Sequence, residues 1–142
     1  RSRRMNFLVF VYGSLKEGFG NHGFLEGSEF ICSTRTKRRS YRMISLDAFP
    51  AVLCGGKNAI SGELYQVDLM TMLYLDRLES NGELYERKLV ELDSGHKAWM
   101  YCFLYNMRNN KKQPRVLTKN RVQTWILTEN EESELFRGKP VD

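Results

Sequence analysis

The sequence predicts an α+β domain that is rich in β-strands and has one principal helix. Several short segments are rich in apolar, β-branched or aromatic residues and are bounded by glycine, proline, asparagine or aspartate, which is typical of strands. One segment instead repeats its leucines at helical spacing behind an aspartate. The chain has 142 residues, 42% of them hydrophobic, which is enough for one core. We expect residues 1–142 to form a single domain, with residues 1–4 as an added remnant or mobile tip and 130–142 as a flexible tail.

The N-terminal part of the chain is predicted to form short strands around a loop. Residues 6–12 are apolar almost throughout, which indicates a buried strand, and the glycine-rich residues 13–23 indicate a loop. Residues 29–36 and 41–46 are strand-like. Residues 49–53 are apolar but contain a proline, so we expect an edge or a turn into a strand there.

The principal helix is predicted over residues 68–79, after a further strand over 59–67. Asp68 is a good N-cap, and the Ser-Asn-Gly sequence at 80–82 is a natural stop. The leucines at helical spacing are Leu69, Leu73, Leu75 and Leu78.

The C-terminal part is predicted to add a hairpin, a loop and a last strand. Residues 84–92 and 97–106 are strand-like, and the Asp-Ser-Gly sequence between them is a hairpin signal. Residues 106–121 carry six Lys or Arg and no acid, so we expect a long loop. Residues 121–127 are expected to form a short strand.

Charge and hydropathy limit the partners. Arg1, Arg3 and Arg4 supply three of the five net positive charges, so the basic balance of the rest is only +2. No apolar run approaches the ~18 residues of a membrane span, and no apolar segment with a cleavage site follows the arginines, so we expect neither membrane contact nor a signal peptide. The basic stretches at 35–42 and 108–121 are typical of solvated loops, which makes nucleic acid the less favoured partner.

The cysteines and histidines give no metal-site pattern. Cys32, Cys54 and Cys102 are scattered and form no C-x-x-C pair, which indicates a reducing compartment and thiols that pack as small hydrophobes. His22 and His96 are the only histidines. We therefore expect a cytoplasmic protein with no metal and no cofactor.

The first candidate site is the turn after the first predicted strand, which consists of Tyr12, Gly13, Ser14 and Leu15. It is either a plain strand-to-loop turn or an anion-binding loop in which successive backbone N–H groups hold a carboxylate or phosphate. The G-x-S-x-G frame of a hydrolase, the lysine of a P-loop and the dinucleotide fingerprint are all absent.

The second candidate is the pair of acids at the end of the predicted helix, Asp76 and Glu79, which share a face because they are three residues apart. One interpretation is a solvated helix end. The helix dipole disfavours acids at a C-terminus, however, and such departures from local preference concentrate at functional sites. A partly buried carboxylate there would have a raised pKa, which suits a general base near neutral pH.

The third candidate set is Tyr85 and Arg87, which follow the helix stop. They are either polar residues on an exposed strand or part of a site. In a site, Arg87 could hold a carboxylate by a two-pronged bond.

Together these motifs resemble the γ-glutamylcyclotransferase-like family, also called AIG2-like. They run in order from about residue 8 to about residue 105: VYGSLK at 11–16, then Gly18 and Asn-His at 21–22, GELY at 62–65, LDRLE at 75–79 and YER at 85–87. The extended YGSLKEG start with its Asn-His pair is more similar to the γ-glutamylamine cyclotransferase branch than to the glutathione-degrading branch.

The resemblance implies a small mixed-strand β-barrel with helices packed outside. It implies that Tyr12, Gly13, Ser14 and Leu15 hold the γ-glutamyl group, that Glu79 is the general acid/base, and that Tyr85 positions the substrate or lines the pocket. The implied substrate is a γ-glutamylamine or γ-glutamyl peptide, whose α-amine attacks its own γ-amide to give 5-oxoproline and a free amine without a cofactor. A non-catalytic γ-glutamyl-binding or interaction module is the main alternative, and a nucleic-acid-binding protein is the other.

Overall fold

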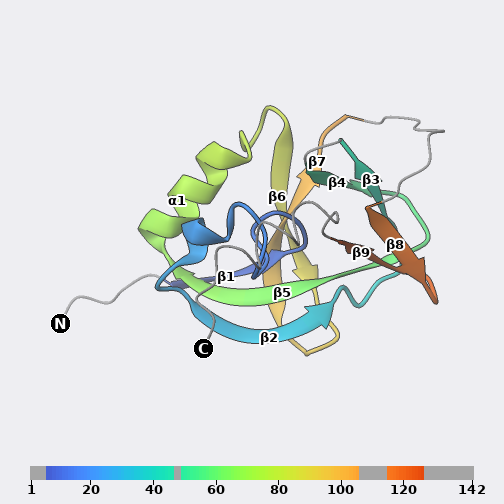
Figure 1. The fold of residues 1–142 in the computed structure, drawn as a ribbon, viewed down its shortest axis with the longest axis horizontal. Helices are drawn as coiled ribbons and strands as arrows, with labels where there is room; N and C mark the ends of the chain where they lie inside the picture. The colour runs from blue at the N-terminus through green and yellow to red at the C-terminus, as the bar shows by residue number, and fades with distance from the viewer. Residues whose placement is uncertain (1–5, 47–48, 106–114, 127–142) are drawn as a thin grey trace, which may run out of the picture.

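A computed structural model of the chain describes residues 6–46, 49–105 and 115–126. A mixed seven-stranded sheet has the order β6-β7-β1-β5-β9-β8, with β2 paired to β5 beside that path, and β3 and β4 form a separate pair. The sheet curls into a half-barrel, with α1 at one side and the β3–β4 and β8–β9 pairs at the opposite end (Figure 1). The elements are β1 (Asn6–Val11), η1 (His22–Leu25), β2 (Glu29–Arg35), β3 (Tyr41–Ser45), β4 (Pro50–Cys54), β5 (Ala59–Asp68), α1 (Leu69–Leu78), β6 (Tyr85–Glu91), β7 (Lys97–Phe103), β8 (Val116–Lys119) and β9 (Val122–Trp125).

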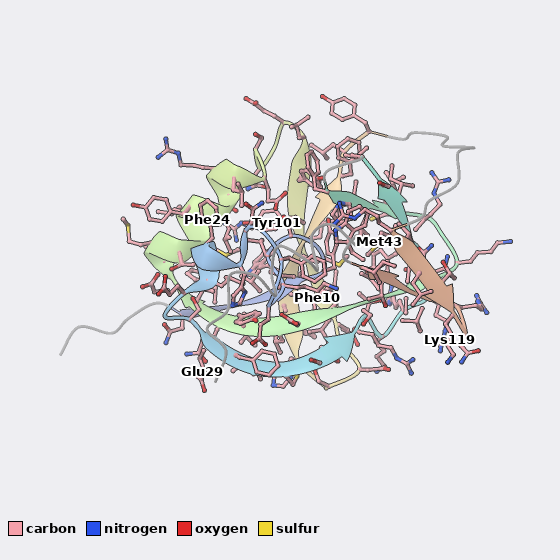
Figure 2. The ribbon with its side chains drawn as sticks, in the orientation of Figure 1. Phe10, Phe24, Glu29, Met43, Tyr101 and Lys119 are labelled. Carbon is pink, nitrogen blue, oxygen red and sulfur yellow. The ribbon has the colours of Figure 1, made fainter. Side chains whose placement is uncertain are left out.

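Strand β1 lies inside the sheet and is buried on both faces. It runs antiparallel to β5 and parallel to β7. Because side chains alternate along a strand, Val9 and Val11 pack in one cluster with Leu75 of α1, whereas Phe10 packs in a second cluster with Trp125 of β9. A strand covered on both sides needs a continuous apolar run, which explains the sequence of residues 7–12. Figure 2 shows Phe10 and Tyr101 in the middle of the molecule, while Glu29 and Lys119 lie at its periphery.

Helix α1 is capped as predicted and buries one narrow face. The Asp68 carboxylate accepts a hydrogen bond from the Thr71 N–H at 2.8 Å. The residues that α1 buries are Met72 and Leu75, and Glu79 continues this stripe one turn later. Of the four leucines at helical spacing, Leu75 is buried, whereas Leu69, Leu73 and Leu78 are 42%, 48% and 37% exposed. The helix rests on the sheet through one narrow stripe, so it cannot bury all the apolar residues of the segment.

The end of α1 is a Schellman motif. The Ser80 N–H donates to the Arg77 carbonyl at 3.2 Å, and the Asn81 N–H donates to the Asp76 carbonyl at 2.8 Å. The helix stops where the Ser-Asn-Gly sequence predicts. The residue in the left-handed conformation at this position is Ser80, with φ of 47°, although glycine is the usual choice there.

Part of the predicted C-terminal loop is a strand. Residues 116–119, expected within the loop 106–121, form β8 and pair with β9 in an antiparallel hairpin. The turn consists of Asn120 and Arg121, which both have positive φ, 52° and 60°. Two such residues make the tight turn that suits a hairpin, but without glycine the sequence does not indicate the turn.

The short helix η1 begins inside the predicted loop 13–23, and the sequence analysis did not predict it. The tip at 1–4, residues 106–114 and the tail at 130–142 lie outside the described residues.

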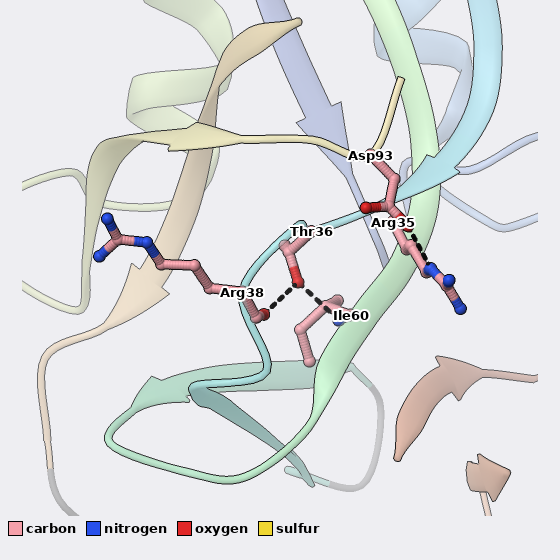
Figure 3. Close-up of polar contacts among 5 residues, drawn as sticks. All are labelled: Arg35, Thr36, Arg38, Ile60 and Asp93. Atoms are coloured by element: carbon pink, nitrogen blue, oxygen red, sulfur yellow. Dashed lines mark hydrogen bonds and ion pairs between the residues drawn. The ribbon is translucent and has the colours of Figure 1, made fainter. Parts of the chain in front are cut away.

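The basic stretch after β2 is held to the sheet by polar contacts (Figure 3). Arg35 Nε lies 2.6 Å from the Asp93 carboxylate, an ion pair between exposed side chains. Thr36 is buried, and its hydroxyl donates to the Arg38 carbonyl at 3.1 Å and accepts from the Ile60 N–H at 3.0 Å. These contacts give the start of the stretch a structural role.

The thiols differ in their surroundings. Cys102 is buried in the core, as expected of a small hydrophobe, whereas Cys54 is exposed at the end of β4. None of the helices in the described part of the chain is long and apolar enough to cross a membrane.

Candidate active site

A cavity opens where β1 ends and its walls come from distant parts of the chain. The turn after β1 forms one wall, the start of β4 forms another, and the end of α1 with the neighbouring ends of β6 and β7 forms a third. The residues that line it are Phe10, Val11, Tyr12, Gly13, Ser14, Leu15, Asn21, Phe49, Pro50, Glu79, Tyr85 and Tyr101. The structure thus brings together the predicted turn, Glu79 and Tyr85, and it leaves Arg87 outside the lining.

The turn after β1 is shaped by its own hydrogen bonds. The Lys16 N–H donates to the Gly13 carbonyl at 3.0 Å. Asn21 holds Ser14 twice, through its side-chain amide to the Ser14 hydroxyl at 2.9 Å and through its N–H to the Ser14 carbonyl at 2.8 Å. The N–H groups of Gly13, Ser14 and Leu15 donate no hydrogen bond to any residue that the structure describes. Three successive unpaired donors beside a cavity favour the anion-binding interpretation over a plain turn.

Gly13 is required by a close approach between this turn and β4. A Cβ atom at residue 13 would lie 2.5 Å from the Pro50 Cγ atom, far inside van der Waals contact. The proline ring is stiff and is itself buried, so it cannot move aside freely. Glycine therefore lets the turn and the first residue of β4 enclose the cavity together.

We expect Gly13→Ala to destabilise the protein by about 1–3 kcal/mol and to distort the cavity, because the added methyl group must displace Pro50. Gly20→Ala is the matched control, since a Cβ atom at residue 20 of the same loop meets nothing within 4 Å. Urea unfolding of both variants checks the prediction. Equal stability of the two variants would contradict the close packing of Gly13 against Pro50.

Glu79 is the carboxylate that faces the cavity. Its backbone N–H donates to the Leu75 carbonyl at 2.9 Å and closes the helix. Its side chain is largely buried and has no hydrogen bond or ion pair with any other described residue. Burial disfavours the charged form and raises the pKa of Glu79 to about 7. Both protonation states are therefore populated near neutral pH.

The Tyr12 and Tyr85 hydroxyls near Glu79 donate their hydrogen bonds to backbone carbonyl groups. The Tyr12 hydroxyl donates to the Tyr101 carbonyl at 2.6 Å, and the Tyr85 hydroxyl donates to the Pro50 carbonyl at 3.1 Å. Burial, and next the charge of Glu79, raise the pKa of Tyr12 and of Tyr85 above the ordinary value. Both hydroxyls therefore stay protonated at neutral pH, and each already donates its one proton. Glu79 is left as the group in this wall that titrates near pH 7.

Asp76, the other acid at the helix end, is occupied by structural contacts. Its carboxylate accepts a hydrogen bond from the Tyr101 hydroxyl at 2.6 Å and lies 3.0 Å from Arg87 Nε. The Arg87 guanidinium also stacks over the Trp99 ring, 4.8 Å from its centroid. The two acids that share a helix face therefore differ in their partners. Arg87 contacts Asp76 and Trp99, and through them it supports Tyr101 in the cavity wall.

The burial of Lys16 was not predicted from the sequence. It is 7% exposed, and its ammonium group donates to the Trp125 carbonyl at 2.8 Å and lies 4.6 Å from the centroid of the Phe19 ring. Burial lowers the pKa of Lys16 to about 8, and the charge of Glu63 opposes that shift. A lysine in a glycine-rich loop normally suggests solvent exposure. Here it fastens the site-forming turn to the end of β9.

Two further lining residues were missed for different reasons. Tyr101 lies within the predicted strand 97–106, but nothing in its neighbourhood marks it as a site residue. The sequence around Pro50 predicts only an edge or a turn into a strand. In the described residues, no three side chains of His, Cys, Asp or Glu are grouped so that they could hold a metal ion.

Comparisons of sequence and of fold with known proteins identify the family that the sequence motifs resemble. The family model described as "Gamma-glutamyl cyclotransferase, AIG2-like" matches residues 9–126. A Vibrio cholerae protein provisionally named a gamma-glutamylcyclotransferase is 38% identical over 99 residues, which cover 70% of this chain and 84% of that protein. Gamma-glutamylaminecyclotransferase A of Danio rerio is 38% identical over 93 residues, 59% of this chain and 57% of that protein. The crystal structure of a mouse AIG2-like protein has a TM-score of 0.64 at 23% identity, covers 70% of this chain and 78% of that one, and shows the shared fold.

Proposed function

Because this chain belongs to the gamma-glutamyl cyclotransferase, AIG2-like family, we propose that it converts a γ-glutamylamine or γ-glutamyl peptide into 5-oxoproline and a free amine, with Glu79 as the general acid/base. The observation that carries this proposal is the meeting of Glu79 and the turn after β1 in one cavity. The similarity to the Danio rerio gamma-glutamylaminecyclotransferase favours a γ-glutamylamine over a peptide.

The turn after β1 would bind the negative charge of the substrate. The free N–H groups of Gly13, Ser14 and Leu15 suit either the α-carboxylate or the oxyanion that develops on the γ-carbonyl. Asn21 keeps the turn in this shape through its two bonds to Ser14. Tyr12 and Tyr85 supply flat walls for the aliphatic part of the γ-glutamyl group.

Glu79 would carry the proton. The α-amino group of a substrate is largely protonated at neutral pH and cannot attack until it loses a proton. A carboxylate with a pKa of about 7 can accept that proton. It can then donate the proton to the departing nitrogen, which would otherwise leave as an unstable amide anion.

The reaction is a ring closure within one molecule. The α-nitrogen forms a bond to the γ-carbonyl carbon, the carbonyl becomes tetrahedral, and the bond to the leaving amine breaks as Glu79 protonates it. Holding both reacting groups of one substrate in the attacking geometry corresponds to an effective concentration of ~10⁵ M or more. The cavity therefore has to fold the substrate and manage one proton.

Turnover of a γ-glutamylamine tests the proposal. We expect the purified protein to release 5-oxoproline from γ-glutamyl-lysine isopeptide, detected by mass spectrometry, and Glu79→Gln to release far less. A protein that binds the isopeptide but forms no 5-oxoproline would instead be a non-catalytic γ-glutamyl-binding module. Strongly salt-dependent retention on DNA or RNA would favour the nucleic-acid alternative.

We expect Asp76→Asn to lower stability by about 1–3 kcal/mol, because Arg87 would keep a partly buried charge without its partner. The variant also removes the anionic acceptor of the Tyr101 hydroxyl, so we expect kcat to fall about tenfold with a smaller change in KM. Tyr101→Phe is the matched control, because it removes the hydrogen bond to Asp76 altogether and keeps the ion pair. If Tyr101→Phe lost as much stability as Asp76→Asn, the ion pair between Asp76 and Arg87 would not be the source of the loss, and the prediction would be wrong.

A further inference from the structure

Two cysteines are absent from the cavity lining and stand apart from the proposed chemistry. Cys54 is the last residue of β4 and is exposed, whereas Cys102, in β7, is 2% exposed. The two thiols are close enough for Cys54 to raise the pKa of Cys102, whose sulfur lies 3.9 Å from the Met100 carbonyl oxygen. Lys88 of β6 adds a positive charge, with its ammonium group 3.9 Å from the Cys54 sulfur.

The pairing of β6 with β7 places these groups on one face of the sheet. Lys88 pairs with Met100 and Glu86 pairs with Cys102. Because alternate residues of a strand point to the same side, Lys88 and Cys102 share a face. Contact between Lys88 and Cys54 therefore puts the end of β4 over that same face, and β4 packs against β7.

The third cysteine provides an internal comparison. Cys32 lies on β2, where it pairs with Leu64 of β5, and β2 is not a neighbour of β7 in the sheet. It is partly buried. Cys32 packs from β2 against the core cluster that contains Cys102, whereas Cys54 ends β4, which packs against β7.

We propose that Cys54 and Cys102 form an oxidation site for hydroperoxides, in which the exposed Cys54 reacts first and the buried Cys102 closes a disulfide. In the first step the Cys54 sulfur attacks the O–O bond of the peroxide, which yields a sulfenic acid and releases an alcohol, or water when the oxidant is hydrogen peroxide. In the second step the Cys102 sulfur attacks the sulfenic sulfur and water leaves. The peroxide gains the two electrons that the two thiols lose.

The surroundings suit this order of events. Cys54 is the accessible sulfur, and the Lys88 ammonium attracts negative charge that develops on it. Cys102 is shielded from solvent, and burial together with contact with Cys54 raises the pKa of its thiol to about 12, so it is a poor first nucleophile. The resulting bridge would join β4, which carries Pro50, to β7, which carries Tyr101, both of which line the cavity.

The test is treatment of the purified full chain with hydrogen peroxide, followed by alkylation under denaturing conditions and peptide mapping by mass spectrometry. We expect the number of alkylated thiols to fall from three to one, with a peptide pair linked through Cys54 and Cys102 and a mass loss of about 2 Da. Cys32→Ser should still form the bridge, and Cys54→Ser should not. In Cys102→Ala, Cys54 should proceed to sulfinic acid because no second thiol rescues it. Lys88→Met should slow the bridge about 3- to 10-fold.

Oxidation that stops at Cys54 in the wild-type chain, with Cys102 still alkylated, would overturn the proposal. So would a bridge that contains Cys32. An unchanged bridging rate in Lys88→Met would overturn the role given to Lys88. These readouts do not depend on enzyme activity, so they stand or fall separately from the ring-closure chemistry.

Discussion

Glu79→Gln is expected to lower kcat by about 10²–10⁴-fold, the usual contribution of general acid–base catalysis. Glutamine has nearly the same shape as glutamate and keeps hydrogen-bonding atoms in the cavity, but it cannot accept the proton of the α-amine. KM should therefore change much less than kcat. The measurement is the initial rate of 5-oxoproline release at saturating γ-glutamyl-lysine.

The same variant should be more stable than the wild type above neutral pH. The pKa of Glu79 is raised from 4.5 to about 7 in the folded state, so between these values the folded protein holds a proton that the unfolded chain releases. Wild-type stability therefore falls as pH rises through this window, and the full cost is present above pH 7. Glutamine removes this cost, which we expect to be about 1–3 kcal/mol at pH 8 and absent at pH 4. Urea unfolding at the two pH values measures it.

Together, the kinetic and stability measurements show whether Glu79→Gln loses activity only because it misfolds. A Glu79→Gln protein that is inactive because it is misfolded would be less stable at pH 8, not more stable. A folded variant with wild-type activity would mean that another group carries the proton. Gly20→Ala, at an open position of the same loop, supplies the comparison for unspecific effects of substitution.

The second large effect is the dependence of the rate on pH. Since Glu79 must be deprotonated to act as a base and its pKa is about 7, kcat/KM should approach a tenfold fall per pH unit well below pH 7, which amounts to about 50-fold between pH 7 and pH 5. The residual rate of Glu79→Gln should lack this limb. Tyr101→Phe should retain it, because that variant leaves the acid in place. A wild-type profile that is flat between pH 5 and pH 7 would contradict the assignment.

The strands and the helix could largely be predicted because local chemistry determines them. The apolar run at 6–12 can be buried only as a strand covered on both faces, and Asp68 marks the start of the helix by capping Thr71. The hairpin of β6 and β7 follows from the Asp-Ser-Gly turn at 93–95. The residues that the resemblance pointed to in the turn, together with Glu79 and Tyr85, line one cavity.

The parts that escaped prediction depend on contacts between distant segments. Nothing near Lys16 in the sequence indicates that the Trp125 carbonyl will bind its ammonium group, 109 residues away. Arg87, which could hold a substrate carboxylate, lies outside the cavity lining and contacts Asp76 and the Trp99 ring. Strand β8 was missed because its turn reaches positive φ with Asn120 and Arg121 rather than with glycine.

The central claim is that one cavity holds the γ-glutamyl group between the turn after β1 and the Glu79 carboxylate. A crystal structure with 5-oxoproline bound tests it most directly. We predict that an anionic oxygen of the product accepts hydrogen bonds from the N–H groups of Gly13 to Leu15, and that a Glu79 carboxylate oxygen lies within about 2.6–3.2 Å of the ring nitrogen or of a bridging water. A product bound elsewhere, or a Glu79 side chain turned away into solvent, would contradict the claim.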